Sequence, residues 1–497
     1  MRSWVGRGAA LAALLMTFAI GVPVASAGAG GGDRHGDAQL RDYAARTWAS
    51  MTAMTDTGSG LPADVLNADG TTSVQTSTTN IGAYMWSAVA ARRLGLIGDR
   101  ELVARLTTTI GTLEHMERFG DTGQFYNWYD HRTGAKLTSW PPSPTDEFHP
   151  ILSSVDNGWL AVGLRIVQRS VPQLAARAGA LYDAMDFGFY YRPDVNRVLF
   201  HYRPDDPAAS PCCYDTVVSE SRIVDYLGIS KGQLPPKEYF GRWRTFPDTC
   251  ANSFQEQKPT GETRTYYGVP VYEGAYTYNN TKLVPSWGGS MFEALMPDLF
   301  VPEERWGPNS WGLNHPRTVA AQIHHGLADA GYGVWGFSPS NTPEGGYGAY
   351  GVDAIGMDPN GNPSNEDHTL VDGGFAGCDG QGGRPAQPDP PASAYTNGVV
   401  TPHAAFLALR YAPRETVADL ARLQRYPGMY GKWGFRDSVN VQTGTPSGSY
   451  LSLDQGMIMA SLGNALGGDV LRDAFAGRTE ERALRPVIGI EQFSLSG

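Results

Sequence analysis

Residues 217–227 read VVSESRIVDYL, a pattern that predicts a helix whose valine, isoleucine and leucine side chains share one apolar face. Glu220 falls in the middle of that face, whereas Arg222 and Asp225 are expected to pair on the polar face. A carboxylate aimed at a core is costly unless it is paired, and its pKa tends to rise. Active sites use such carboxyl groups as general acids.

Two other predicted helices begin in the same way. Asp156 starts a helix in VDNGWL (155–160), and Asp454 starts another in LDQGM (453–457). Each aspartate shares a face with the apolar residues that follow it. A helix N-terminus favours an anion, so ordinary capping stays open as an alternative for both. Glycoside hydrolysis needs one protonated and one ionised carboxyl, and Glu220 and Asp156 suit these two roles.

Helical patterns dominate the rest of the chain, and about twelve helices are expected between aromatic and Gly/Pro loops. Strand-like material is sparse, at residues 198–202 and 263–271, and residues 379–394 read as an irregular surface loop. Paired helices in this number suggest an all-α (α/α)6 barrel, a toroid with long loops and a few short strands. The ends of its inner helices would define a single cleft. The predicted helices cover residues 40–54, 80–96, 99–118, 156–168, 172–185, 217–229, 290–299, 316–330, 402–411, 417–424, 453–466 and 468–475.

The N-terminal sequence predicts export. Two arginines, an apolar run over residues 9–24 and the small residues of Ala25-Ser26-Ala27 make up a secretory signal peptide, 1–27, cleaved near Ala27. The apolar run is short for a membrane span. We expect a flexible tail at residues 28–38, then a single catalytic domain over residues 39–497 of a secreted, extracellular protein.

Composition limits the partners. The net charge of −11 argues against nucleic acid and anionic membranes. The 61 glycines, 24 tyrosines, 18 phenylalanines and 12 tryptophans suit a sugar-binding cleft, although a large core with many turns would share this composition. We expect an oligo- or polysaccharide substrate and a monomer.

No cofactor or metal is expected. The chain has no HExxH, GxSxG, GxGxxG or P-loop pattern, which leaves metalloprotease, esterase and nucleotide-binding interpretations without support. His324 and His325 are adjacent and cannot face one metal on a helix. For His315 and His403, each next to a proline near a predicted helix start, we expect structural roles.

The four cysteines are Cys212, Cys213, Cys250 and Cys378. Export favours disulfides. We expect the adjacent pair not to bond to each other, and bridges from this pair to the other two are an open alternative. The chain has no CxxC spacing, so a zinc ribbon is not supported.

Three acids lie beside aromatic residues and glycines, which suits hydrogen bonding to sugar hydroxyls. They are Asp130 in FYNWYD (125–130), Glu293 in SWGGSMFE (286–293) and Asp437 in WGFRD (433–437). A turn or a structural salt bridge is the alternative for each. The other expected substrate contacts are Trp128, Trp287 and Trp335 as stacking platforms, together with Tyr129, Asn157, Arg222 and Asp454.

Short motifs follow one another along most of the chain: TSTTNIG (76–82), FYNWYD (125–130), SSVD (153–156), SESR (219–222), PSWGGSMFE (285–293), YGVWGFSP (332–339), VTPH (400–403), YGKWGFRD (430–437) and LDQG (453–456). Because it carries these motifs in this order, the chain resembles the glycoamylase-like proteins grouped with glycoside hydrolase family 144, the bacterial β-1,2-glucanases. The resemblance implies an (α/α)6 barrel and endo-acting hydrolysis of β-1,2-glucan with inversion. It also implies Glu220 as the acid and places Asp156 among the candidates for the base.

Alternatives of other classes stay open. A secreted glycan-binding protein without activity would keep the aromatic residues but need no buried acid. A polysaccharide lyase would need a tyrosine or histidine base and a cationic partner for a uronate. A hydrolase or transglycosylase could also act on another bacterial or fungal polysaccharide.

Overall fold

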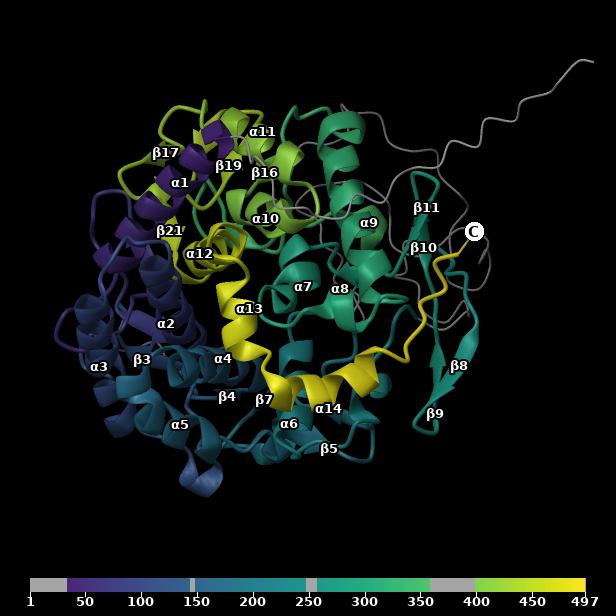
Figure 1. Ribbon diagram of the computed structural model, residues 1–497, viewed down its shortest axis with the longest axis horizontal. Coiled ribbons are helices and arrows are strands. Elements are labelled where there is room, and N and C mark those ends of the chain that lie inside the picture. The colour runs from purple at the N-terminus through teal and green to yellow at the C-terminus, as the bar shows by residue number, and fades with distance from the viewer. Residues whose placement is uncertain (1–33, 144–147, 247–256, 358–397, 497) are drawn as a thin grey trace, which may run out of the picture.

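The computed structural model of the protein describes residues 34–143, 148–246, 257–357 and 398–496, and it is an (α/α)6 barrel, as predicted (Figure 1). Within this part of the chain, six helices form the inner ring. Helix α2 packs between α12 and α4, α4 packs on α6, and α10 packs between α12 and α7. Hydrogen bonds from Arg222 of α6 to two carbonyls of α7 close the ring. The inner helices are α2 (Thr78–Arg93), α4 (Ser154–Ser170), α6 (Arg222–Ser230), α7 (Met291–Leu295), α10 (Pro402–Leu407) and α12 (Ser452–Gly467).

The outer layer is less regular than the inner ring. Among the described residues no outer helix connects α6 to α7; two hairpins, β8–β9 and β10–β11, occupy that stretch of chain, and the C-terminal helix α14 packs on α6 instead. Short helices complete the base of the barrel. The outer and closing helices are α1 (Arg34–Ala53), α3 (Asp99–His115), α5 (Ala175–Ala184), α8 (Glu303–Trp306), α9 (Trp311–His324), α11 (Pro413–Leu423), α13 (Val470–Phe475) and α14 (Arg478–Ile488).

Small residues let the inner helices approach closely. Helix α2 is buried from residue 78 to residue 91, as expected for a helix surrounded by others. A Cβ atom added to Gly82 would lie 2.4 Å from the carbonyl oxygen of Trp159, and one added to Gly163 would lie 2.8 Å from the Cα of Gly82. On the other side of α2, a Cβ on Gly456 would meet the Cβ of Ala83 at 2.6 Å. Larger residues at these positions would push the ring apart.

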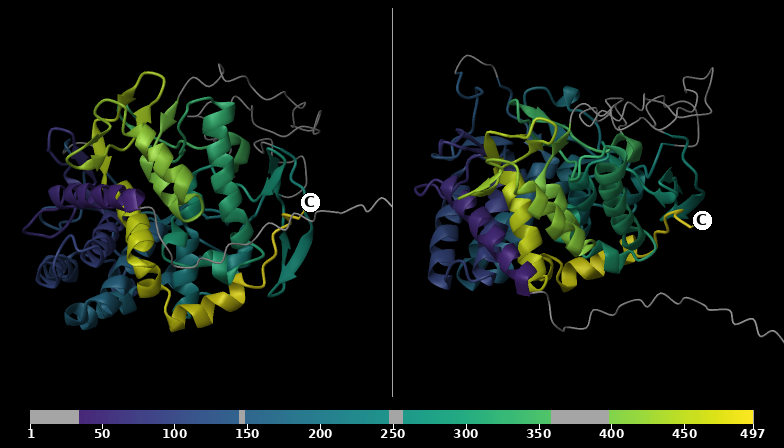
Figure 2. Two further views of the ribbon diagram at one scale, coloured as in Figure 1. Left: turned by 45° about the horizontal axis from the view of Figure 1, so that its top comes forward. Right: turned by 90° about the horizontal axis from the view of Figure 1, so that it is seen from above.

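The strands are short and join loops rather than form a layer. Residues 263–271 form a hairpin, as predicted, whereas residues 198–202 contribute to two separate strand pairs. In the right-hand view of Figure 2, yellow-green strands lie above one end of the helices. The pairs are β1 (Val65–Asn67) with β21 (Ser449–Leu451), β2 (Gln75–Ser77) with β3 (Trp128–Asp130), β4 (Leu152–Ser153) with β7 (His201–Tyr202), β5 (Tyr191–Arg192) with β6 (Arg197–Val198), β8 (Thr263–Tyr266) with β9 (Val269–Tyr272), β10 (Tyr276–Tyr278) with β11 (Thr281–Leu283), β12 (Ser286–Trp287) with β15 (Gly356–Met357), β13 (Ser340–Asn341) with β14 (Tyr347–Gly348), β17 (Tyr430–Gly431) with β18 (Gly434–Phe435), and β19 (Val439–Asn440) with β16 (Val399–Val400) and β20 (Thr445–Pro446).

Several predicted boundaries were wrong. Helix α1 begins at Arg34, so residues 34–38 are helical rather than part of a flexible tail. Helix α6 begins at Arg222 rather than at residue 217, because the five residues before it form bends and turns. Glu220 therefore precedes the helix instead of lying on its apolar face. Helices α8 and α14 were not predicted.

The predicted surface pair of Arg222 and Asp225 does not form. Both side chains are fully buried and have other partners: Arg222 binds Glu303, and Asp225 binds Arg242. The prediction assumed that one face of this helix meets water, but α6 is an inner helix and every face of it is covered. Charged residues on such a helix need buried partners of opposite charge.

Cys212 and Cys213 form a disulfide with each other, so the expectation that they would not bond was wrong. The peptide bond between them is cis and their Cα atoms are 3.1 Å apart, which brings the two sulfur atoms together. Cys250, Cys378, the predicted signal peptide and the predicted loop at residues 379–394 lie outside the described residues. Over the described part of the chain, no helix has both the length and the apolar character to cross a membrane.

Candidate active site

Carboxyl groups gather where the inner helices begin. Asp156, Glu293 and Asp454 lie in the first turns of α4, α7 and α12, and Glu220 lies two residues before α6. Asp437 follows strand β18 and joins this group through its contact with Asp454. The common direction of the inner helices explains the arrangement, because their N-termini meet at one end of the barrel. The structure thus brings five predicted site residues to one place.

Glu220 is held by two neighbours. The indole Nε1 of Trp159 donates a hydrogen bond to Oε2 of Glu220 at 2.5 Å. The backbone N–H of Glu220 donates to Oε2 of Glu293 at 2.7 Å. Burial, and then the nearby charge of Glu293, raise the pKa of Glu220 well above its ordinary value. The raised pKa favours the protonated form of Glu220, the form that an acid catalyst needs.

Asp156 is fixed by hydrogen bonds from three sides. The hydroxyl of Thr79 donates to Oδ1 at 2.5 Å, and Ser153 caps the helix by accepting from the Asp156 N–H at 3.2 Å. With its amide nitrogen facing Asp156, Asn127 donates to Oδ2 at 2.9 Å and accepts from Nε1 of Trp128 at 2.9 Å. Burial raises the pKa of Asp156. Asp156 can therefore lie in a capped first turn of its helix and also contribute its carboxyl group to the site.

Asp437 and Asp454 form a second pair of interacting carboxyl groups. Burial, and then the charge of Asp454, raise the pKa of Asp437 well above its ordinary value, so Asp437 holds the proton that the pair shares. Burial raises the pKa of Asp454 to about 7. His403 Nδ1 lies 2.9 Å from Oδ2 of Asp454, and burial lowers the pKa of His403 to about 4, so the imidazole is neutral. The same Nδ1 is hydrogen-bonded to the Thr401 hydroxyl at 2.8 Å, so the neutral histidine packs beside the carboxyl pair, a neighbour that its sequence context did not reveal.

Other predicted substrate contacts lie inside the protein. Trp335, Tyr129 and Asn157 are buried, and their polar groups bind protein partners: the Tyr129 hydroxyl donates to the Glu117 carbonyl, and the Asn157 amide binds the backbone of Phe125. These contacts are those of structural residues. The assignment of these three residues, and of the fully buried Arg222, to substrate contacts stays a prediction.

The remaining predicted substrate contacts, Trp128, Trp287 and Asp130, lie in different surroundings. Trp128 and Trp287 are half-buried. Trp128 touches the Asn127–Asp156 unit, and the N–H of Trp287 donates to the Val218 carbonyl, two residues before Glu220. Both therefore lie beside the carboxyl groups, and their role as stacking platforms stays a prediction. Asp130 instead forms a salt bridge with Arg132 beside a turn, which was the structural alternative for it.

The residues that hold the acids in place were not predicted as their partners. Trp159, Thr79 and Asn127 fall within the quoted motifs, but they lie far along the chain from the acids they contact, and the motifs do not show which acid each one meets. A buried polar residue at the start of an inner helix, such as Thr79, is the one signal that could have been used.

A buried group of Asp298, Glu303 and His315 has the spacing of metal ligands. Arg222 binds Glu303, and Arg472 lies 2.6 Å from Asp298, so two guanidinium groups balance the two carboxylates. We interpret this group as an ion-pair network that ties α6 and α13 to the base of the barrel.

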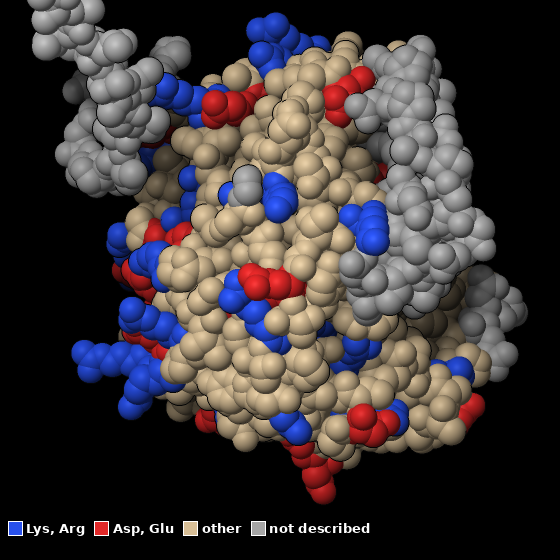
Figure 3. Space-filling view, turned by 90° about the vertical axis from the view of Figure 1, so that its right-hand side faces the viewer, with Lys and Arg blue, Asp and Glu red and all other residues tan. Residues whose placement is uncertain are grey.

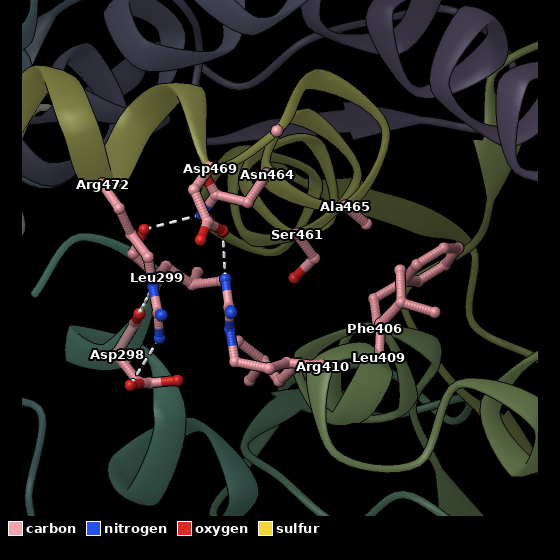
Figure 4. Close-up of a pocket in the computed structure, with 12 residues that line it drawn as sticks. Asp298, Leu299, Phe406, Leu409, Arg410, Ser461, Asn464, Ala465, Asp469 and Arg472 are labelled. Carbon is pink, nitrogen blue, oxygen red and sulfur yellow. Dashed lines mark hydrogen bonds and ion pairs between the residues drawn. The ribbon is translucent and has the colours of Figure 1, made fainter. Parts of the chain in front are cut away.

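A cavity of about 340 Å³ lies beside the second half of α12 (Figure 4). Ser461 and Asn464 of α12 face it, opposite Asp298 and Arg410. Ser461 is seven residues after Asp454, which corresponds to about 10 Å along a helix. This cavity is therefore separate from the carboxyl groups at the helix N-termini.

Replacing Trp159 with phenylalanine is expected to move the alkaline limb of the pH–activity profile. The lost N–H stabilises ionised Glu220, so its removal raises the pKa of Glu220 further, and the acid keeps its proton to a pH higher by about one unit. The measurement is kcat/KM against pH. Trp48→Phe, which changes a buried tryptophan elsewhere in the core, is the control, and an unmoved limb in Trp159→Phe would contradict the assigned contact.

Comparison with known proteins supports the resemblance seen in the motifs. Residues 262–476 match the family model Glycoamylase, described as "Putative glucoamylase", and residues 42–188 match a model described as "Protein of unknown function (DUF3131)". The cyclic β-(1,2)-glucan synthase NdvB of Rhizobium meliloti (strain 1021) is 23% identical over 88% of this chain. The chain spans 18% of the length of that curated relative.

Two solved structures share the fold over nearly the whole chain. A "putative glucoamylase" from Bacteroides caccae ATCC 43185 superposes with a TM-score of 0.65 and 18% identity, covering 91% of this chain and 99% of the other. The endo-β-1,2-glucanase from Chitinophaga pinensis, in complex with sophorotriose and glucose, superposes with a TM-score of 0.64 and 17% identity, covering 91% and 98%. The resemblance to glycoamylase-like proteins is thus confirmed, and so is the (α/α)6 barrel.

Proposed function

We propose that the protein is a secreted glycoside hydrolase that cleaves a β-glucan internally, with β-1,2-glucan as the first substrate to test. The observation that carries this proposal is Glu220, a partly buried carboxyl with a raised pKa that lies among further carboxyl groups. This is the pairing of proton donor and carboxylate that glycosidic cleavage requires. The names of the similar proteins, an endo-β-1,2-glucanase and a β-(1,2)-glucan synthase, favour this linkage.

In this proposal, Glu220 donates a proton to the leaving oxygen and Asp156 activates water. The hydrogen bonds from Thr79 and Asn127 hold both oxygens of Asp156 in place and stabilise its ionised form. An ionised, oriented carboxylate opposite a protonated one is the arrangement of an inverting hydrolase. Trp128 and Trp287 supply ring surface beside the two acids.

Glu293 favours a second candidate, transfer of the sugar rather than hydrolysis. Its carboxylate accepts from the backbone N–H of Glu220, so it lies next to the acid. A carboxylate near the acid suits a retaining mechanism, in which the carboxylate attacks the sugar and forms a covalent intermediate. An acceptor sugar could then take the place of water.

A panel of β-1,2-, β-1,3-, β-1,4- and β-1,6-glucans, followed by reducing-sugar release and by the anomer of the first product, tests the proposal. We expect cleavage of the β-1,2-glucan and an α-anomeric product. Asp156→Asn should then lower kcat by about 100-fold or more, and Glu293→Gln by less. A β-anomeric product, with Glu293→Gln the more damaging variant, would replace inversion by the retaining candidate. Release from none of the glucans would overturn the proposed substrate class.

Two other interpretations have less support. A binding protein needs no protonated acid, so the raised pKa of Glu220 favours an enzyme. A lyase acting on a uronate needs a cationic partner, whereas the predicted site residues gathered at this end of the barrel are carboxyl groups, which repel an anionic sugar when ionised.

The proposal also includes export of the protein and a substrate without charge. On the face shown in Figure 3, the described acidic and basic side chains are interspersed among uncharged ones, without a continuous basic surface. Together with the net charge of −11, this favours a neutral glucan over nucleic acid. We expect the protein recovered from culture medium to begin near Gly28 when its N-terminus is sequenced, and an intact Met1 would contradict export by the signal peptide.

A further inference from the structure

A small hairpin beside the carboxyl groups carries an exposed tyrosine. Strands β13 and β14 pair in antiparallel register, with Asn341 opposite Tyr347. Gly345 and Gly346 form the turn with φ angles of 100° and 95°, a conformation that L side chains rarely adopt. The N–H of Thr342 donates to the Gly346 carbonyl at 3.0 Å and closes the turn. The turn chemistry therefore fixes where Tyr347 lies along the hairpin.

The hairpin is attached to the candidate site. The backbone N–H of Asn341 donates to Oδ2 of Asp437 at 2.6 Å, and its side-chain amide donates to Ser449 at 2.7 Å. The hydroxyl of Ser438 donates to the Asn341 carbonyl. Since Asn341 is the strand partner of Tyr347, these bonds place the tyrosine beside the carboxyl groups.

Packing in the protein core does not explain why Tyr347 is a tyrosine. It is 60% exposed, the highest value among the large hydrophobic side chains of the described residues. Although much of the residue is exposed, loss of water around its hydroxyl, and then the charges of Asp454, Asp437, Glu220 and Glu293, raise its pKa well above the ordinary value, so the hydroxyl lies near these four carboxyl groups. The phenol is therefore a neutral hydrogen-bond donor among acceptors. A core-packing role would require the ring to be covered.

We propose that Tyr347 is a substrate-contacting residue, whose ring packs on one face of a pyranose bound between the Glu220–Glu293 pair and the Asp437–Asp454 pair. Tyrosine suits this role because it offers a rigid apolar face with a polar tip. An exposed aromatic surface beside polar groups is a common mark of a binding site. The ligand class is a neutral glucan, so the inference rests on the proposed function.

The test compares Tyr347→Ala and Tyr347→Phe with the wild type. We expect the alanine variant to raise KM about tenfold with a smaller change in kcat, because the contact holds the sugar rather than reacts with it. The phenylalanine variant keeps the ring and should stay within about threefold of the wild-type KM. Tyr267→Ala removes another exposed tyrosine, 49% exposed in the β8–β9 turn, and should change neither constant.

A binding measurement distinguishes a failure of this inference from a failure of the proposed function. The dissociation constant of a β-1,2-linked glucose oligosaccharide is measured by calorimetry for Glu220→Gln with and without Tyr347→Ala. Weaker binding in the double variant supports the contact even if the wild type hydrolyses nothing, which would overturn the hydrolase alone. Equal binding, with KM unchanged in the active background, would overturn the contact alone. No binding of any glucan in the panel would overturn both.

Discussion

Glu220→Gln is expected to lower kcat on the cleaved glucan by between about 100- and 10,000-fold, with little change in the thermal unfolding midpoint. Glutamine keeps the size of the side chain and can still accept the hydrogen bond from Trp159. It cannot deliver a proton to the leaving oxygen. The loss should therefore appear in kcat, whereas KM should change little.

The raised pKa of Glu220 also predicts on which side of the pH profile the activity falls. Burial and the charge of Glu293 raise the pKa of Glu220, so its protonated form persists to a higher pH than that of an ordinary glutamate and is lost as the pH rises through that raised pKa. Wild-type activity should fall on the alkaline side for this reason. The Glu220→Gln residual activity should lack that limb, because the amide does not titrate.

Rates are measured by reducing-sugar release at several substrate concentrations. Glu262→Gln, which changes a glutamate whose side chain is 62% exposed on the hairpin side, is the control and should match the wild type. If Glu220→Gln retained half of the wild-type kcat, another residue would have to supply the proton, and the assignment of the acid would be wrong.

Helix patterns predicted the architecture and most of the acids for a physical reason. The inner helices are apolar over most of their length, so a carboxyl group at their first turn stands out against the pattern. This identified Asp156 and Asp454 directly. For Glu220 the same reasoning singled out a residue that lies beside the other carboxyl groups, but from a wrong helix start, because bends rather than a helix precede Arg222.

The partners of these acids could not be predicted, because periodicity gives the faces of one helix and not what covers them. Trp159 contacts Glu220 across 61 positions of sequence, and Asn341 contacts Asp437 across 96. The same limit explains the errors. Arg222 was assigned to the solvent side of a surface helix, but α6 lies in the inner ring and buries it.

Arg222→Met is expected to be the most destabilising of the substitutions considered, with a loss of about 3–5 kcal/mol in the free energy of unfolding. The fully buried guanidinium donates to both oxygens of Glu303, at 2.6 and 2.8 Å. It also donates to the carbonyls of Ser219, Glu293 and Ala294, at 2.9, 2.8 and 2.7 Å. Methionine fills much of the volume but leaves Glu303 and three carbonyl groups without this donor.

Urea unfolding of the variant and the wild type measures the loss. Arg46→Met is the matched control, since Arg46 pairs with Asp42 on the surface, with side chains 42% and 49% exposed. Exposed pairs contribute about 0–1 kcal/mol, so this control should differ little from the wild type. A loss in Arg222→Met no larger than that of the control would contradict the role given to the buried network.

The destabilisation should also depend on pH. Burial alone would raise the pKa of Glu303, but the charge and hydrogen bonds of Arg222 hold it down at about 2. A folded-state pKa below the unfolded value contributes stability at higher pH, and that contribution is lost as the pH falls toward 2. Without Arg222, Glu303 is a buried carboxylate that gains by taking up a proton. The difference between variant and wild type should therefore be largest at neutral pH and should shrink toward about pH 4, where the unfolded glutamate titrates. A difference that stayed constant across this range would show that lost packing, rather than an uncompensated charge, causes the destabilisation.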